Sequence, residues 1–132
     1  MKLLLISDLH TTANKQKLIL KNADYDIICR LGDNDESDLD IIIVNAKVVP
    51  ILGVLGNHDL LSLYDNFPSI NHINNKLFTE NNLPFIGVDG SLRYKDNPNI
   101  AMRTREEYDK IINNLPVAYI LLNHTGPIKA SY

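Results

Sequence analysis

Three short apolar runs, each ending at a cluster of polar residues, constrain the fold of this chain most strongly. Residues 2–6, 26–31 and 48–55 have the composition of strands that are buried on both faces. The connections between them are long enough to hold a helix, and strand–helix–strand units place their strands parallel in one sheet. The sequence therefore predicts an α/β fold in which the carboxyl ends of the strands share one edge, where such sheets bind ligands.

Two helices are predicted between these strands. Residues 14–22 carry apolar positions at the spacing of a short amphipathic helix. Residues 37–47 are ambiguous, because residues 41–44 read Ile-Ile-Ile-Val, which favours a strand, whereas Ser37 and Asp38 favour a capped helix. The length of the connection between the second and third predicted strands favours the helix, which we therefore predict.

The second half of the chain predicts a more antiparallel arrangement. Residues 73–79 and 84–88 have strand composition and are divided by Asn81 and Asn82, which are typical of a turn. The remaining predicted elements are a loop over residues 89–99, a helix over 104–115 with Glu106 and Glu107 in its first turn, and a strand over 117–122.

Composition and charge limit the possible functions. The 132 residues, 45% of them hydrophobic, suffice for one domain over residues 1–132 with one core. A net charge of −3 argues against sequence-independent binding to nucleic acids or anionic membranes. No apolar run approaches a bilayer span, and the first strand leads directly into Ser7 and Asp8, so we expect a cytoplasmic protein. The lone Cys29 is predicted to be a buried small hydrophobe in a reducing compartment.

The polar clusters carry the candidate chemistry, and three of the four histidines lie in them. In chain order they are Asp8-Leu9-His10, Gly32-Asp33-Asn34-Asp35, Gly56-Asn57-His58-Asp59 and Asn123-His124. Carboxylate, imidazole and amide groups together suit manganese, iron, zinc or cobalt. Asp33 is placed to bridge two cations roughly 3.5–4 Å apart. His58 is the candidate group for stabilising charge or protonating a leaving oxygen, with Asp59 or Asp35 orienting it.

The ordered pattern D-x-H, G-D, G-N-H-D and a later H resembles the calcineurin-like metallophosphoesterases over residues 1 to about 126. The resemblance implies a four-layer αββα sandwich and a phosphodiesterase or phosphatase that uses two divalent ions and a bridging hydroxide. Manganese is the first choice of metal, with iron, zinc or nickel as alternatives. The implied ligands are Asp8 and His10 on one ion, Asp33 between the two, and Asn57 and His124 on the other, with His58 as the catalytic residue that binds neither.

The family pattern normally ends in G-H-x-H, and this sequence stops at Tyr132 without it. We therefore expect a domain that lacks its last strands and two metal ligands. Three explanations stay open: a truncated chain, a metal shell completed by water or another subunit, or lost activity. The alternative function is a catalytically impaired module that binds a protein or ligand, although the retained His58 argues against it. An exposed edge at residues 117–122 predicts a possible homo-oligomer.

Other polar residues have a structural explanation beside the functional one. Arg93 and Tyr94, with Lys95, follow a Gly-Ser pair and are assigned as possible contacts of a phosphate-ester substrate, against the alternative of an exposed loop. His72 lies in a polar segment and is predicted to be a solvated loop residue. Asp38, Asp40, Glu106 and Glu107 are predicted to be charges on helix surfaces.

Overall fold

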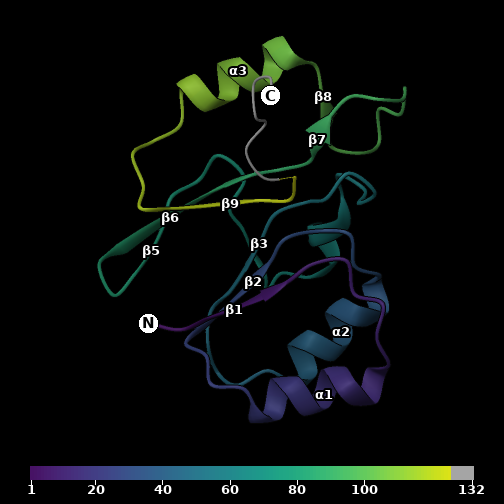
Figure 1. The fold of residues 1–132 in the computed structure, drawn as a ribbon, viewed down its shortest axis with the longest axis vertical. Helices are drawn as coiled ribbons and strands as arrows, with labels where there is room; N and C mark the ends of the chain where they lie inside the picture. The colour runs from purple at the N-terminus through teal and green to yellow at the C-terminus, as the bar shows by residue number, and fades with distance from the viewer. Residues whose placement is uncertain (126–132) are drawn as a thin grey trace, which may run out of the picture.

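The first half of the chain forms a parallel sheet that is covered on one side by two helices. The computed structural model describes residues 1–125, and Figure 1 shows this sheet with α1 and α2 beside it. The strands pair in the order β1 (Leu3–Ile6), β2 (Ile27–Arg30), β3 (Ile51–Gly53) and β4 (Asn71–His72), with α1 (Ala13–Asn22) and α2 (Glu36–Asn45) as crossovers. The predicted βαβ units are confirmed.

A second sheet follows in the other half of the chain. It pairs in the order β5 (Phe78–Glu80), β6 (Leu83–Val88) and β9 (Ile120–Asn123), antiparallel in the first pair and parallel in the second. The described residues also form a 3₁₀ turn (Leu63–Asn66), the small pair β7 (Ser91–Leu92) and β8 (Met102–Arg103), and α3 (Arg105–Asn113). In Figure 1, α3 lies beyond the second sheet, at the end opposite α1 and α2, so the layers run helix, sheet, sheet, helix.

The ambiguous segment at residues 37–47 is helical, as predicted. Asp38 is not merely a surface charge, because its carboxylate accepts a hydrogen bond from the backbone N–H of Asp35 at 3.2 Å and so caps α2. The same carboxylate accepts from Gln16 of α1 at 2.7 Å. Leu39 and Ile42 are buried against the sheet. Capping and burial therefore override the strand propensity of the β-branched run.

The predicted strand over residues 73–79 is wrong in its bounds, whereas its antiparallel pairing with residues 84–88 is confirmed, because Phe78 and Thr79 lie opposite Phe85 and Pro84. β4 pairs in parallel with β3, and β5 begins only at Phe78. Ile73 instead joins the two sheets, because its N–H donates to Gly53 at 3.1 Å and its carbonyl accepts from Gly87 at 3.1 Å. Asn75 then turns the chain with a φ of 55°. The chain must leave one sheet for the other here, so a continuous strand is impossible.

The turn between β5 and β6 is the one that the sequence predicts. Asn81 and Asn82 both have positive φ, at 50° and 62°, as in the two-residue turn that best fits the twist of a hairpin. Two other boundaries differ from expectation. The third strand begins at Ile51 rather than at residue 48, and the predicted loop over residues 89–99 contains β7.

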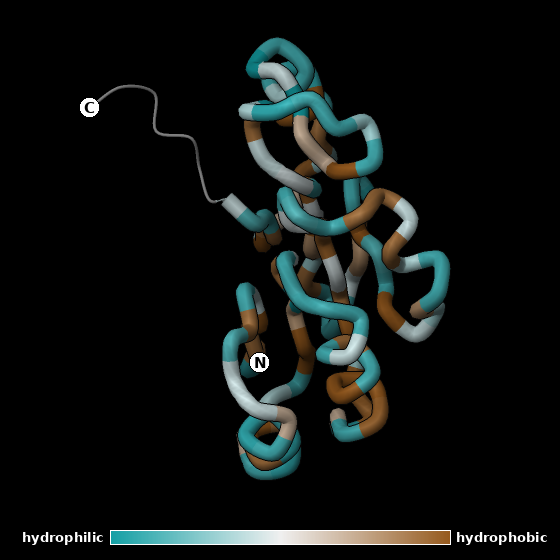
Figure 2. The backbone as a smooth tube through the Cα atoms, turned by 90° about the vertical axis from the view of Figure 1, so that its right-hand side faces the viewer, coloured by the Kyte–Doolittle hydropathy of each residue, from teal (hydrophilic) through white to brown (hydrophobic). Residues whose placement is uncertain are grey.

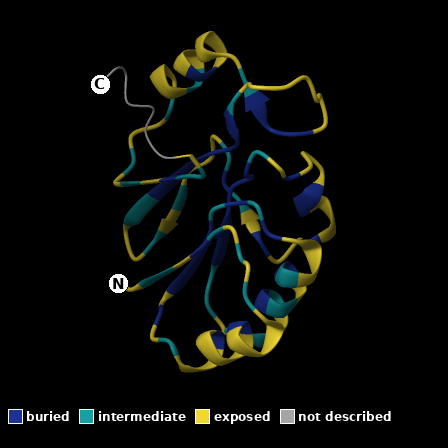
Figure 3. Ribbon diagram, turned by 45° about the vertical axis from the view of Figure 1, so that its right-hand side comes forward, coloured by how far each residue is buried: buried dark blue, intermediate teal, exposed yellow. Residues whose placement is uncertain are grey.

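The two sheets pack face to face around a buried core. Figure 3 shows buried segments through the centre of the molecule and exposed residues mainly on the helices and loops. The core residues between the sheets are Ile27, Cys29, Leu52, Val54, Ile73, Phe85 and Leu122. Burial raises the pKa of the Cys29 thiol to about 12, so the group stays neutral and the prediction of a small buried hydrophobe is confirmed.

Hydropathy follows this arrangement. In Figure 2 the hydrophobic stretches lie mostly along the inner strands, and the hydrophilic ones mostly on outer turns. Among the helices of residues 1–125, none combines the length and the apolar composition that crossing a bilayer would require.

Both sheets end in a strand that has one neighbour among the described residues. The edge strands are β1 and β4 in the first sheet and β5 and β9 in the second, and on β1 and β9 Leu5 is 57% and Leu121 is 52% exposed. Unpaired backbone groups and exposed leucines at an edge favour pairing with another chain. The homo-oligomer therefore stays a prediction, and the exposed edges at β1 and β9 are the surfaces through which it would form.

Adjacent leucines on β9 test the assignment of the core between the sheets. Leu122 is 4% exposed, so we expect Leu122→Ala to lower the free energy of unfolding by about 2–5 kcal/mol through lost burial and a residual cavity. Leu121→Ala is the matched control, with an expected loss below about 1 kcal/mol. Urea denaturation followed by circular dichroism measures both, and equal losses would contradict the assignment.

Candidate metal centre

The carboxyl ends of β1, β2, β3 and β9 converge on one pocket. Its volume is about 450 Å³, and it contains every residue that the sequence assigned to metal binding or catalysis. The lining residues are Asp8, His10, Asp33, Asn34, Asp35, Asn57, His58, Asp59 and His124. The strand-end argument thus places residues up to 116 positions apart, from Asp8 to His124, at one site.

The backbone beneath the pocket is tightly turned. Asp8 and Asp33 both adopt left-handed conformations, with φ of 47° and 56°, which cost energy for any residue with a side chain. The two turns are tied together, because the N–H of Asp8 donates to the carbonyl of Gly32 at 3.2 Å. A Cβ atom on Gly56 would lie 2.1 Å from Asp33 Oδ1. The glycine therefore lets backbone and carboxylate approach closely.

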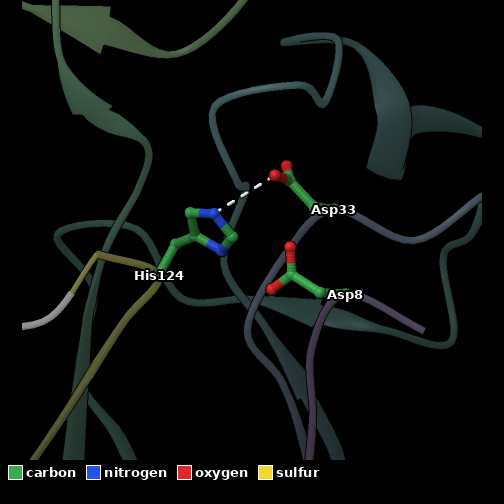
Figure 4. Close-up of side chains that lie close together, drawn as sticks. All are labelled: Asp8, Asp33 and His124. Carbon is green, nitrogen blue, oxygen red and sulfur yellow. Dashed lines mark ion pairs between the residues drawn. The ribbon is translucent and has the colours of Figure 1, made fainter. Parts of the chain in front are cut away.

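Three of the predicted ligands form a compact group. Asp8, Asp33 and His124 each present a ligand atom, and these atoms lie within 4.8 Å of one another, as Figure 4 shows. His124 Nε2 is 3.2 Å from Asp33 Oδ2 and 2.9 Å from Asn57 Oδ1. The other oxygen of Asp33 accepts from the backbone N–H of His58 at 2.9 Å. The carboxylate of Asp33 is thus fixed at the centre of the group.

Hydrogen bonds behind the group set the orientation of its ligands. His124 Nδ1 lies 2.8 Å from the carbonyl of Leu31, which can only accept, so Nδ1 carries a proton. The amide of Asn57 donates through Nδ2 to the Tyr94 hydroxyl at 2.8 Å, which leaves Oδ1 facing His124. A neutral His124 then directs a lone pair from Nε2 at two oxygen acceptors. A cation between these atoms, either a metal ion or a second proton on the imidazole, would relieve the repulsion between their lone pairs.

The donor set fits a divalent transition metal. Imidazole nitrogen, amide oxygen and carboxylate oxygen converge, as a mixed nitrogen and oxygen site requires. Asp8 is exposed, and the hydroxyl of Ser7 donates to its Oδ2. His10 lines the pocket but lies outside the compact group of three. The predicted pairing of His10 with Asp8 on one ion therefore stays a prediction.

Asp59 lies at the base of the pocket in a buried ion pair. Its carboxylate accepts two hydrogen bonds from Arg30, at 2.7 and 2.9 Å, and the Arg30 side chain is fully buried. Asp59 Oδ2 also accepts from the N–H of Gly56 at 2.7 Å and from that of Asp33 at 3.0 Å. These contacts make Asp59 a residue that holds the turns at Asp33 and at Gly56. Among the described residues, no hydrogen bond joins the Asp59 carboxylate to His58, so the predicted role of Asp59 in orienting His58 stays a prediction.

Sequence reasoning missed Arg30, whose polar contacts are extensive. Nη1 donates to the Tyr64 hydroxyl at 2.8 Å and to the carbonyl of Val54 at 3.1 Å, and Nε donates to Asn34 at 3.0 Å. The available signal was a charged residue at the end of an apolar strand, two positions before the glycine of the G-D motif. Such a residue requires a buried partner.

His72 is not the solvated loop residue that the sequence predicted. It lies in β4, and its Nε2 is 2.8 Å from Oδ2 of the buried Asp89. The ring also contacts Tyr64, with 4.7 Å between the ring centroids. Asp89 Oδ1 accepts from the N–H of Leu55, just before the third polar cluster. His72 thus belongs to a polar network behind the pocket.

Arg93 and Tyr94 lie beside the metal pocket rather than in it. They line an adjoining hollow of about 430 Å³ that shares Asn57 with the metal pocket. Of these two residues, Tyr94 is hydrogen-bonded to a predicted metal ligand, Asn57, and within the described part of the chain Arg93 has no such bond. The assignment of both as substrate contacts stays a prediction.

Removal of the buried arginine tests the support of the site. Arg30→Met leaves the Asp59 carboxylate buried without its partner, so we expect a loss of about 3–5 kcal/mol in the free energy of unfolding. Arg105→Met, at an exposed position on α3, is the control and should have little effect. Chemical denaturation measures both, and an Arg30→Met protein as stable as the parent would contradict the role of the pair.

Comparison with known proteins agrees with this geometry. The sequence profile of the calcineurin-like phosphoesterase superfamily domain matches residues 1–114. No curated protein and no solved structure matches the chain. The matched range contains the first three polar clusters and all elements from β1 to α3. The chain belongs to the calcineurin-like phosphoesterase superfamily.

Proposed function

We propose that this chain hydrolyses phosphate esters with two divalent metal ions, manganese as the first choice. Family membership supports a metal-dependent phosphoesterase-type function. The ligands we propose are Asp8, His10, Asp33, Asn57 and His124. The observation that carries the proposal is the convergence of His124 Nε2 on oxygens of Asp33 and Asn57, which leaves a position for a cation.

The charge of the pocket supports a need for metal ions. Asp8, Asp33 and Asp35 line it with carboxylates, whereas the positive charge of Arg30 is already matched by Asp59. A phosphate ester is an anion and is repelled by such a lining in the absence of added positive charge. Bound divalent ions would supply that charge, polarise the phosphoryl group and activate water.

The side chains then have separate tasks. Asp33 is held by the N–H of His58 on one oxygen, so its other oxygen has a fixed direction toward the centre of the site. His58 is exposed at the pocket and is available to donate a proton to the leaving alcohol oxygen. In the overall reaction water forms a new P–O bond, the ester P–O bond breaks, and the alcohol leaves with a proton.

The variant Asp33→Asn tests the proposal with little change of shape. An amide keeps an oxygen that can accept from His58 but removes the charge that would hold two cations. We expect manganese-dependent hydrolysis of a chromogenic phosphodiester by the parent protein, and a loss of about 100-fold or more in kcat/KM in the variant. Asp40→Asn, on the exposed face of α2, should leave the rate unchanged.

The outcomes separate the possible functions. Hydrolysis that persists without divalent ions, or equal rates in Asp33→Asn and the parent, would contradict the proposal. Metal binding without hydrolysis of either a diester or a monoester would favour a non-catalytic binding module. A comparison of the two ester classes also identifies which of them the parent protein prefers.

A further inference from the structure

A second cavity adjoins the metal pocket and has a different character. It is lined by Asn57, Ser91, Leu92, Arg93, Tyr94 and Thr125, and its volume is about 430 Å³. Asn57 lines both cavities, so the second space begins beside a proposed metal ligand. We call these six residues the Tyr94 hollow.

Tyr94 connects the hollow to the metal centre by a hydrogen bond. Its hydroxyl accepts from Asn57 Nδ2 at 2.8 Å, and Asn57 Oδ1 lies 2.9 Å from His124 Nε2. The phenol is therefore hydrogen-bonded directly to one proposed metal ligand, Asn57. The bond also holds the amide with its oxygen toward His124, which is the orientation that a metal ligand needs.

The ring of Tyr94 is largely exposed, with Lys95 Nζ over it at 5.5 Å from the centroid, so a ligand ring would stack on the other face or displace this flexible side chain. The residue is 60% exposed although its hydroxyl is bound, so much of the ring faces solvent. Leu92 adds apolar surface beside it, and Arg93 adds a positive charge. The segment is anchored, because the N–H of Arg93 donates to the carbonyl of Arg103 at 2.8 Å in the β7–β8 pair. An apolar wall with a few polar groups is typical of a small-molecule site.

We propose that the Tyr94 hollow binds the alcohol part of the ester and selects substrates in which that part carries a flat ring, either an aryl group or a nucleobase. This inference rests on the proposed function, since the phosphate must lie at the metal centre. A flat ring stacks on the exposed face of Tyr94, whereas an alkyl group of similar length gains less.

Two variants separate the roles of the ring and the hydroxyl. Tyr94→Phe keeps the stacking surface but removes the bond to Asn57, so it should weaken all phosphate ligands without changing the preference for a ring. Tyr94→Ala removes both. Tyr119→Ala is the control, because Tyr119 is also an exposed tyrosine, at 83%, and lines neither cavity.

The experiment measures binding instead of turnover. The metal-loaded full chain is titrated by calorimetry with phenylphosphonate and with methylphosphonate, neither of which has an ester bond to hydrolyse. We expect the parent to bind the phenyl compound about 10-fold more tightly, from the size of ring stacking. Tyr94→Phe and Tyr119→Ala should keep this ratio, and Tyr94→Ala should reduce it to about one, as the stacking surface is lost.

Other outcomes overturn the inference in distinguishable ways. Equal affinities for the two phosphonates in a metal-loaded parent, or an unchanged ratio in Tyr94→Ala, would refute the hollow as a ring site and leave the proposed hydrolase intact. Absence of metal uptake, measured beforehand by titration with Mn²⁺, would refute the proposed function and this inference with it. Metal uptake without binding of either phosphonate would refute this inference, and the hydrolysis assay of the parent and Asp33→Asn then decides on the proposed function.

Discussion

The buried ion pair of Arg30 and Asp59 is the interaction on which the site depends. Arg30 approaches from β2 and Asp59 from the loop after β3, so the pair crosses between two strand ends. Because Asp59 also accepts from the N–H groups of Gly56 and Asp33, one carboxylate fixes both turns. Removing either partner would leave a buried charge unpaired, which is costly, so the two charged residues depend on each other.

The positions of the candidate metal ligands could be predicted because they follow local signals. Each buried strand ends at a polar residue, and parallel strands bring such ends to one edge. The partner of Arg30 could not be predicted in this way, since it lies 29 residues away and no periodicity links the two. The pairing of β4 could not be predicted either, because the strand has only two residues. Their position is determined by the point at which the chain passes from the first sheet to the second.

The same geometry links the fold to the proposed chemistry. His124 comes from the second sheet and Asp33 from the first, so the packing of the sheets determines their 3.2 Å separation. The carbonyl of Leu31 orients the imidazole, and Tyr94 orients the amide of Asn57. The proposed ligands Asp33, Asn57 and His124 are thus held in place by these contacts, which would reduce the entropy lost on binding an ion.

The most direct test of a divalent metal centre is equilibrium dialysis of the full chain against Mn²⁺, with the protonation of the His124 ring followed by NMR. The proposed site predicts saturable uptake of about two ions per chain, with the His124 signal broadened by the paramagnetic metal. No saturable uptake, together with a His124 ring that carries a second proton, would show that the acceptors converge on an imidazolium and would contradict the metal centre.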